Sequence, residues 1–186
     1  MIGALPDRLE VGGKLYGINA DVKNIFRIID AMNDERLTDI SKLLVFISRF
    51  YTEEIPSEYR MEAYEKAREF IDGGRSMMGT RVESVRLVDF EQDELLLFAA
   101  LNSAAKTEIR ALPFVHWWTF LGYYISLPPD SLFAQIVTIR SKKAKGRKLE
   151  KWEHDFYNAN KEMIDLKRKY TPQQQEEIDR INKLLG

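Results

Sequence analysis

Three groups of residues in this sequence could carry chemistry. His116 lies beside Trp117 and Trp118, and a histidine in apolar surroundings can be a metal ligand, a general base or a pH switch. Asp89 and Asp93 lie one helical turn apart and could form a paired-carboxylate or metal site. A basic run from residue 140 to residue 151 could bind phosphate groups. Each group also has a purely structural interpretation.

The structural interpretation is favoured for the histidine and the carboxylates. The only other histidine, His154, lies in a different stretch, so no two-histidine ligand spacing exists. We expect His116 to be a core residue that hydrogen-bonds a helix terminus or a carboxylate. Carboxylates such as Asp89 and Asp93 are favoured at a helix N-terminus by the helix dipole, and the spacing of a calcium loop is missing. The chain has no cysteine, which excludes disulfides, thiolate nucleophiles and cysteine zinc sites. We therefore predict a non-enzymatic protein without a metal or cofactor.

The basic run is interpreted as a solvated connector. It sets seven cations against Glu150, but it lacks the interleaved aromatic residues of a single-strand platform and the fold pattern of a duplex reader. A net charge of -1 and a pI near 6.2 also disfavour a nucleic-acid partner. Nucleic-acid binding stays as an alternative, and its candidate contact residues are Lys142, Lys143, Lys145, Arg147 and Lys148.

The elements that would position these residues are mainly helical. Gly12-Gly13 between two short apolar runs predicts a β-hairpin. Apolar residues at helical spacing then predict helices over about 22–33, 40–51 and 57–72, the second with a stripe from Ile40 through Leu43, Leu44, Ile47 and Phe50. The first is expected to begin at Asn19 or Asp21, the second at Thr38 or Asp39.

The second half begins after a glycine-rich, basic loop at residues 73–88. Asp89 and Gln92 suggest a capping box for an apolar helix that continues to about residue 101. The segment 112–127 has no formal charge unless its histidine is protonated, and we expect it to be the central, buried helix with Pro113 in its first turn. Adjacent helical positions point about 100° apart, so only one of its two tryptophans should face the core. Another helix should begin at Asp130 or Ser131 and end at Arg140.

The C-terminal part carries an apolar seam with the spacing of a coiled coil. Its residues are separated alternately by three and four positions, which predicts one long helix able to pack along another, within its own domain or in a partner. The candidate partner-binding residues are Leu149, Trp152, Phe156, Met163, Leu166 and Tyr170. A final polar helix is expected from Gln173 to Leu185.

The expected fold class is therefore mainly α, a compact helical domain with a small N-terminal β-hairpin and a C-terminal helical extension. We place the helical domain at residues 1–140, with the loop 73–88 dividing two helical halves, and a basic linker with a helical appendage at 141–186. No apolar run reaches the roughly 20 residues that span a bilayer, and no secretory signal is evident, so we expect a soluble protein without a membrane partner.

A set of motifs in the first 140 residues resembles the bacteriophage gene-product-fifteen family, whose members are small proteins from the tail modules of long-tailed phages and prophages. The similarity begins with the hairpin sequence from Val11 to Asp21. It continues at fitting distances through Leu97-Phe98-Ala99-Ala100 and Phe133-Ala-Gln-Ile136. The family-pattern residues are Asp89, Asp93, His116, Trp117, Trp118 and Arg140.

The resemblance implies a role in phage tail assembly, with no catalytic residues. Members are thought to act as chaperones that hold the long tape-measure protein while tail-tube subunits polymerise around it. The implied partners are the tape-measure protein and the tail-tube protein, with a homo-oligomer as a further possibility, in the cytoplasm of an infected or lysogenic host. The alternative is a structural component of the finished tail.

Overall fold

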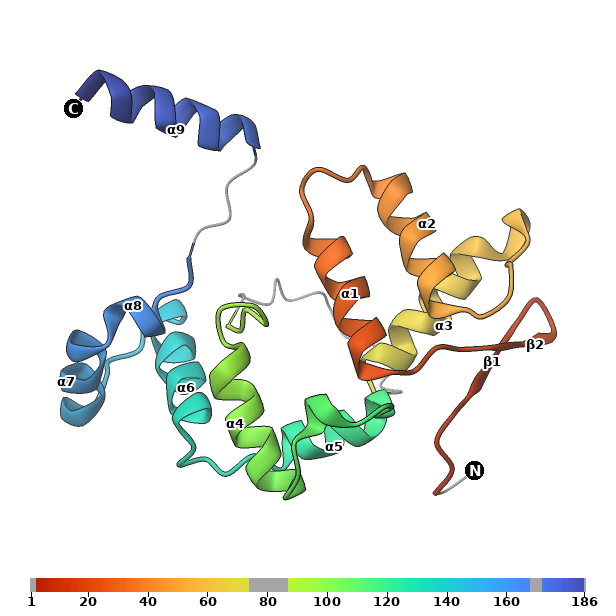
Figure 1. Ribbon diagram of the computed structural model, residues 1–186, viewed down its shortest axis with the longest axis horizontal. Coiled ribbons are helices and arrows are strands. Elements are labelled where there is room, and N and C mark those ends of the chain that lie inside the picture. Colours follow the sequence, from red (N-terminus) through yellow and green to blue (C-terminus); the bar gives the residue numbers. More distant parts are fainter. Residues whose placement is uncertain (1–2, 74–86, 168–171, 186) are drawn as a thin grey trace.

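The computed structural model describes residues 3–73, 87–167 and 172–185, so the predicted loop at 73–88 lies almost entirely outside the described residues. Figure 1 shows a helical protein with one small hairpin, which confirms the expected fold class. The first half consists of β1 (Arg8–Val11), β2 (Lys14–Gly17), α1 (Val22–Asn33), α2 (Asp39–Phe50), the 3-10 turn η1 (Ser57–Tyr59) and α3 (Arg60–Ile71). The second half consists of α4 (Glu94–Ala105), the 3-10 turn η2 (Ile109–Ala111), α5 (Trp117–Ile125), α6 (Leu132–Ala144), α7 (Lys151–Ala159), α8 (Lys161–Ile164) and α9 (Pro172–Leu185).

The predicted hairpin and the first helices are confirmed. β1 and β2 pair antiparallel, and Gly12 and Gly13 both take positive φ in the turn. The Gly12 amide donates to the Glu62 carboxylate at 3.2 Å, which ties the hairpin to α3. Asp21 begins α1 by accepting from the Lys23 amide, and the Thr38 hydroxyl accepts from an amide of α2 in the same way.

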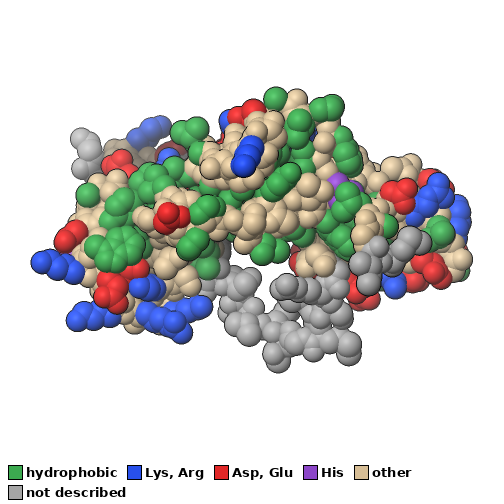
Figure 2. Space-filling view, turned by 90° about the horizontal axis from the view of Figure 1, so that it is seen from below, with side chains coloured by type: hydrophobic (Ala, Val, Ile, Leu, Met, Phe, Trp, Pro, Cys, Tyr) green, Lys and Arg blue, Asp and Glu red, His purple; other side chains and the backbone are tan. Residues whose placement is uncertain are grey.

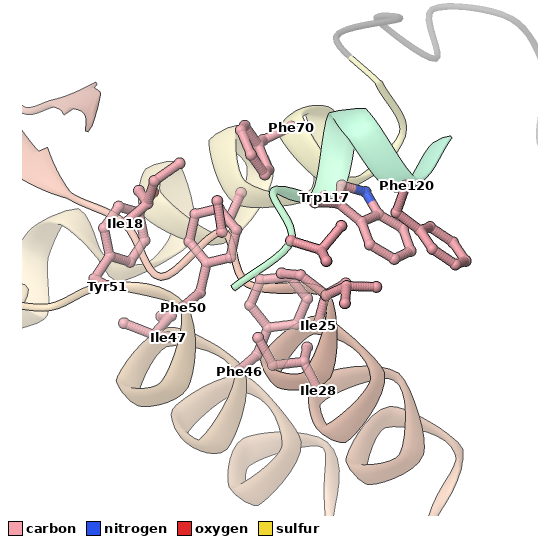
Figure 3. Packing of buried hydrophobic residues seen from close by; sticks show 14 of the residues in the cluster. Ile18, Ile25, Ile28, Phe46, Ile47, Phe50, Tyr51, Phe70, Trp117 and Phe120 are labelled. Carbon is pink, nitrogen blue, oxygen red and sulfur yellow. The ribbon is translucent and has the colours of Figure 1, made fainter. Parts of the chain in front are cut away.

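One hydrophobic core joins the two halves of the chain. Figure 3 shows Ile25 and Ile28 of α1 beside Phe46 and Phe50 of α2, with Trp117 and Phe120 of α5 packed against them. Phe26, also on α1, contacts the rings of Phe90, Phe98, Trp117 and Phe120. The residues after the predicted loop therefore share a core with those before it.

The buried stripe expected on α2 is partly wrong. Ile40 is 72% exposed and Leu44 is 43% exposed, whereas Phe46, which the predicted stripe omits, is buried. The difference arises from tertiary packing. The Phe46 ring lies edge-on to the Tyr64 ring of α3, with 4.9 Å between the ring centroids, so the face of α2 that meets α3 is rotated from the predicted one.

The central helix is shorter and less buried than expected. α5 begins at Trp117 rather than near Pro113, because the backbone before it pairs with the start of α1 instead. Val22 donates to Val115 O at 2.9 Å, and Trp117 donates to Ala20 O at 2.8 Å. Only its first and fourth residues, Trp117 and Phe120, are buried, and Ile125 is 75% exposed. The segment is an amphipathic helix and not a wholly enclosed one.

The C-terminal helices also differ from the prediction. α6 does not end at Arg140 but continues to Ala144, so the proposed boundary between residues 140 and 141 falls within a helix. The predicted continuous helix is interrupted at Asn160, which separates α7 from the short α8. A second, small core of Ile136, Ile139 and Ile164 joins α8 to α6. The expected final helix is present as α9, which Figure 1 shows away from the other helices.

Candidate functional site

The two family-pattern residues Asp93 and Arg140 form a buried ion pair between α4 and α6. Arg140 Nη1 lies 2.6 Å from Asp93 Oδ2, and Nη2 lies 2.9 Å from Oδ1, a bidentate geometry. The side chains are 5% and 1% exposed, respectively. Because an isolated charge is costly to bury, each residue requires the other at this position. The pair therefore has a structural role in this arrangement.

Arg140 also holds two segments of main chain. Its remaining N–H groups donate to the carbonyl oxygens of Leu87, Met163 and Ile164, so all five guanidinium donors have acceptors. The last two carbonyls lie at the end of α8, where a helix leaves its acceptors unpaired and a cation is favourable. Arg140 thus caps α8 while it neutralises Asp93.

Gln92, beside this ion pair, binds the same stretch of chain. Its side-chain amide donates to Asp165 O at 3.0 Å and, at 3.4 Å, to Met163 O. Its side-chain oxygen accepts from the Lys167 amide at 3.0 Å. The first half of the predicted capping box is present, because the Asp89 carboxylate accepts from the Gln92 amide, and also from the Glu91 amide. The second half is wrong: the Gln92 side-chain oxygen is bound to the Lys167 amide, and the Asp89 amide donates to Asp93 instead.

We refer to residues 145–167 as the C-terminal arm, and most of its predicted partner-binding residues face the protein itself. Leu149, Phe156 and Met163 are partly buried against the second core. Leu166 is half-buried, and Tyr170 lies outside the described residues. Trp152 is the exception, since 53% of it is exposed. The seam is therefore divided by the break at Asn160 and used largely for packing in cis.

The predicted phosphate-contact residues divide into two sets. Lys142 pairs with Glu153 of α7 at 2.7 Å, and Lys143 pairs with Asp165 at 2.6 Å while its ammonium lies over the Tyr157 ring. The remaining three, Lys145, Arg147 and Lys148, are exposed and make no ion pair with any described residue. Lys142 and Lys143 therefore form ion pairs within the fold, whereas the other three residues form a cationic surface.

Glu153 is the buried acidic partner of Lys142. Its carboxylate is 3% exposed, and it accepts from both Lys142 Nζ and the Glu150 amide at the start of α7. The hydrogen bond from Lys142 lowers the pKa of this carboxyl below its ordinary value, and the amide contributes in the same direction. Glu153 therefore stays ionised and holds α7 against α6.

Hydrogen bonds from the His116-Trp117-Trp118 motif cap α5 and attach it to α3. His116 Nδ1 accepts from the Trp118 amide at 3.1 Å and caps α5, which confirms the expected bond to a helix terminus. Its Nε2 then donates to Pro6 O at 3.0 Å. The indole N–H groups of Trp117 and Trp118 donate to Ile71 O and Phe70 O at the end of α3. As predicted, Trp117 faces the core, and Trp118 meets a neighbouring element by stacking on Phe70.

Three important residues were missed from sequence: Gln92, Glu153 and Ile164. Gln92 was interpreted only as a capping residue. The sequence pattern singled out neither Glu153 nor Ile164, which lies next to the seam rather than in it. The adjacent Met163 and Ile164 gave one possible signal, because two consecutive apolar residues cannot both follow a single seam.

No group of three or more potential ligand side chains occurs within residues 3–73, 87–167 and 172–185 that could hold a metal ion. Over the same residues, every helix is too short or too polar to cross a bilayer. Hydrophobic side chains instead lie on the outer surface, and Figure 2 shows them over much of one face. The exposed large ones in the second half of the chain include Leu95, Ile125, Leu132 and Trp152.

The family-pattern residues build the scaffold of this helical protein. Asp93 pairs with Arg140 inside the fold, and the indoles of Trp117 and Trp118 bind the end of α3. The chain belongs to the bacteriophage Gp15 protein family, whose family model matches residues 1–166. This match includes α8 and the C-terminal arm almost to its end. Neither the curated proteins nor the solved structures contain a match to this chain.

Proposed function

We propose that this protein is a non-enzymatic tail-assembly chaperone, which binds the tape-measure protein, the tail-tube subunits or both while the phage tail is built. Membership of the bacteriophage Gp15 family is the observation that carries this proposal. In this role the protein acts in the host cytoplasm through protein contacts.

The distribution of apolar side chains supports a binding role. Leu95 is 74% exposed on α4 and Ile125 is 75% exposed on α5, while Leu132 at the start of α6 and Trp152 on α7 are also exposed. Contiguous apolar patches on a folded surface are typical of sites that bind other proteins, and Figure 2 shows apolar side chains next to one another over one face. The family-pattern residues Asp93, His116 and Arg140 are engaged in holding the fold.

Co-expression with the tape-measure protein of the same phage tests the proposal. We expect more of the tape-measure protein in the soluble fraction, and we expect it to co-purify with this chain. A matched co-expression with an unrelated helical protein of similar charge controls for a general effect on expression. The chaperone role is lost if this chain changes neither solubility nor co-purification.

Purified virions separate the chaperone from a structural component of the tail. A chaperone leaves when the tube is complete, so mass spectrometry of virions should find this chain absent or far below the stoichiometry of tail-tube subunits. A stoichiometric amount would favour the structural role.

A further inference from the structure

The C-terminal arm carries a cationic surface that the fold leaves without counter-ions. Lys145, Arg147, Lys148 and Lys151 are exposed, and none forms an ion pair within the described parts of the chain. The acidic residues between positions 145 and 155 are Glu150, Asp155 and the buried Glu153, which is paired with Lys142. Figure 2 shows Lys and Arg side chains gathered at the end of the molecule that contains α6 and α7. We call Lys145, Arg147, Lys148, Lys151 and Trp152 the cationic surface of the arm.

Trp152 gives this surface an apolar anchor. Its side chain follows Lys151 in the first turn of α7, is 53% exposed and belongs to neither hydrophobic core. Tryptophan is enriched among the residues that dominate binding energy at protein interfaces, where a large ring is covered by a partner. An exposed indole within seven residues of four cations that are unpaired among the described residues therefore suits a partner that offers both acidic and apolar groups.

The segments on both sides of the cationic surface are bound to the rest of the protein by hydrogen bonds and ion pairs. Lys142 and Glu153 fasten α6 to α7, while Arg140 and Gln92 hold the end of the arm through its main chain. Gly146 takes positive φ between α6 and α7, which turns the chain at the centre of the basic run. Lys145, Arg147 and Lys148 lie in the short connector between α6 and α7, and Lys151 begins α7. Because both ends of this connector are fastened, binding a partner costs less conformational entropy than binding through a free tail.

We propose that this cationic surface docks an acidic amphipathic helix of a partner protein, with glutamate or aspartate toward the four cations and an apolar residue against Trp152. The inference rests on the proposed function in that it assigns the assembly partner to one surface. Charge complementarity selects the partner: the chain as a whole has a net charge of -1, and this surface reverses that sign locally.

A protein partner fits better than a nucleic acid. Binding to single strands combines a positive groove with several aromatic rings on which successive bases stack, and this surface has one exposed ring. The cations nearer the body, Lys142 and Lys143, are already neutralised by Glu153 and Asp165, which removes them from any phosphate track. One exposed indole and four cations, unpaired among the described residues, in the same short stretch therefore favour an acidic helix with an apolar face over a nucleic acid.

The test uses the full chain and two defined probes: a synthetic helical peptide with leucine on one face and glutamate on the other, and a single-stranded thymidine oligonucleotide. Binding is followed by the fluorescence anisotropy of a dye attached to each probe, at low and at high salt. The test variant is Arg147→Glu with Lys148→Glu. The matched control is Arg27→Glu with Lys66→Glu, two exposed positions on α1 and α3 with the same change of charge. Circular dichroism checks that each variant is folded.

We expect the peptide to bind the wild type and the control alike, and to bind the test variant roughly tenfold more weakly or worse, because reversed charges repel the acidic face. Trp152→Ala should also weaken binding without changing its salt dependence. Equal peptide binding by wild type and test variant overturns the inference, as does absent peptide binding. Tighter binding of the oligonucleotide than of the peptide would assign the surface to nucleic acid instead.

Capture of the tape-measure protein distinguishes this inference from the proposed function. If wild type and the Arg147→Glu, Lys148→Glu variant capture it equally, the chaperone role stands and the surface is wrong. If neither captures it while the peptide shows the expected charge dependence, the surface stands and the choice of partner is wrong.

Discussion

At the scale of single residues, the buried Asp93–Arg140 ion pair is the feature whose loss should cost the most stability. Both side chains are almost fully buried, and Arg140 donates to carbonyl oxygens on two other segments as well as to Asp93. Loss of either side chain leaves an uncompensated charge in the interior, and loss of Arg140 leaves buried carbonyls without donors.

We expect Asp93→Ala to lower the free energy of unfolding by about 3–5 kcal/mol, the range for one partner removed from a buried ion pair. Urea unfolding followed by circular dichroism gives the value. Asp130→Ala, at an exposed position before α6, is the control and should stay within about 0.5 kcal/mol of wild type. A loss below about 1 kcal/mol for Asp93→Ala would show that the pair is solvated or replaceable.

The surface pair Glu108–Arg110 gives a prediction about pH. The hydrogen bond from the Arg110 side chain lowers the pKa of Glu108 from 4.5 to about 2. Since the pKa is lower in the folded protein, the stabilisation is present above pH 4.5 and is lost as pH falls towards 2. NMR titration of the carboxyl carbon should show Glu108 still ionised near pH 3 in the wild type.

In Arg110→Gln the Glu108 titration should move up towards the ordinary value of 4.5. Asp34, whose pKa Arg36 lowers to about 2, is the internal reference and should not move. An unchanged Glu108 titration in the variant would mean that Arg110 is not the cause.

At the scale of elements, the end of α4 contains a locally unfavourable residue. Lys106 is the non-glycine residue with positive φ among those described, at 54°, and its amide donates to Asn102 O to close the helix. This conformation normally favours glycine, because a Cβ atom crowds the backbone there.

Lys106→Gly should therefore raise the free energy of unfolding by about 0.5–1 kcal/mol, and Lys106→Val should lower it. Chemical denaturation of the two variants beside the wild type measures both changes. If the glycine variant is less stable than the wild type, the left-handed cap is absent in solution.

The elements also show how far the sequence could predict the fold. Local signals were sufficient for the hairpin at Gly12-Gly13 and for the helix caps at Asp21 and Thr38, because the side chains that define them act within a few residues. They were insufficient for α5, where pairing of Val115 with Val22 delays the start of the helix. They also failed at Asn160, where the seam breaks because α8 turns back to pack Ile164 on α6.

The candidate site was predictable in part for the same reason. His116 was expected to hydrogen-bond a helix terminus, and it caps α5 through a bond to an amide two residues away. The meeting of Asp93 with Arg140, 47 residues apart, depends on how α4 packs on α6. The charge pattern alone could not separate Lys142 and Lys143, which are paired inside the fold, from Lys145, Arg147 and Lys148, which face solvent.

At the scale of the whole molecule, the protein has two hydrophobic cores of very different size. The larger includes the hairpin and helices α1 to α6, while the smaller has three fully buried residues, Ile136, Ile139 and Ile164. The arm is attached to the body mainly by that small core, by Lys142–Glu153 and by hydrogen bonds from Arg140 and Gln92. Regions with few buried apolar contacts open at lower free energy than the global core.

Hydrogen exchange should therefore be faster in α7 and α8 than in α1 and α2. Glu153→Ala, which removes the buried partner of Lys142, should speed exchange in α7 and α8 while α1 and α2 keep their rates. Glu162→Ala, an exposed change on the neighbouring α8, is the control. Uniform acceleration across all helices would mean that the arm and the body unfold as one unit.

We propose above that this Gp15-family protein helps the tape-measure protein through tail assembly. The most direct measurement is made in lysates of a phage that carries an early stop codon in this gene. Intact tails are counted by electron microscopy, and soluble tape-measure protein is quantified by mass spectrometry. The chaperone role predicts few or no tails together with a depleted soluble tape-measure protein, both restored when the wild-type chain is supplied in trans. Normal tails and a normal level of soluble tape-measure protein would contradict it.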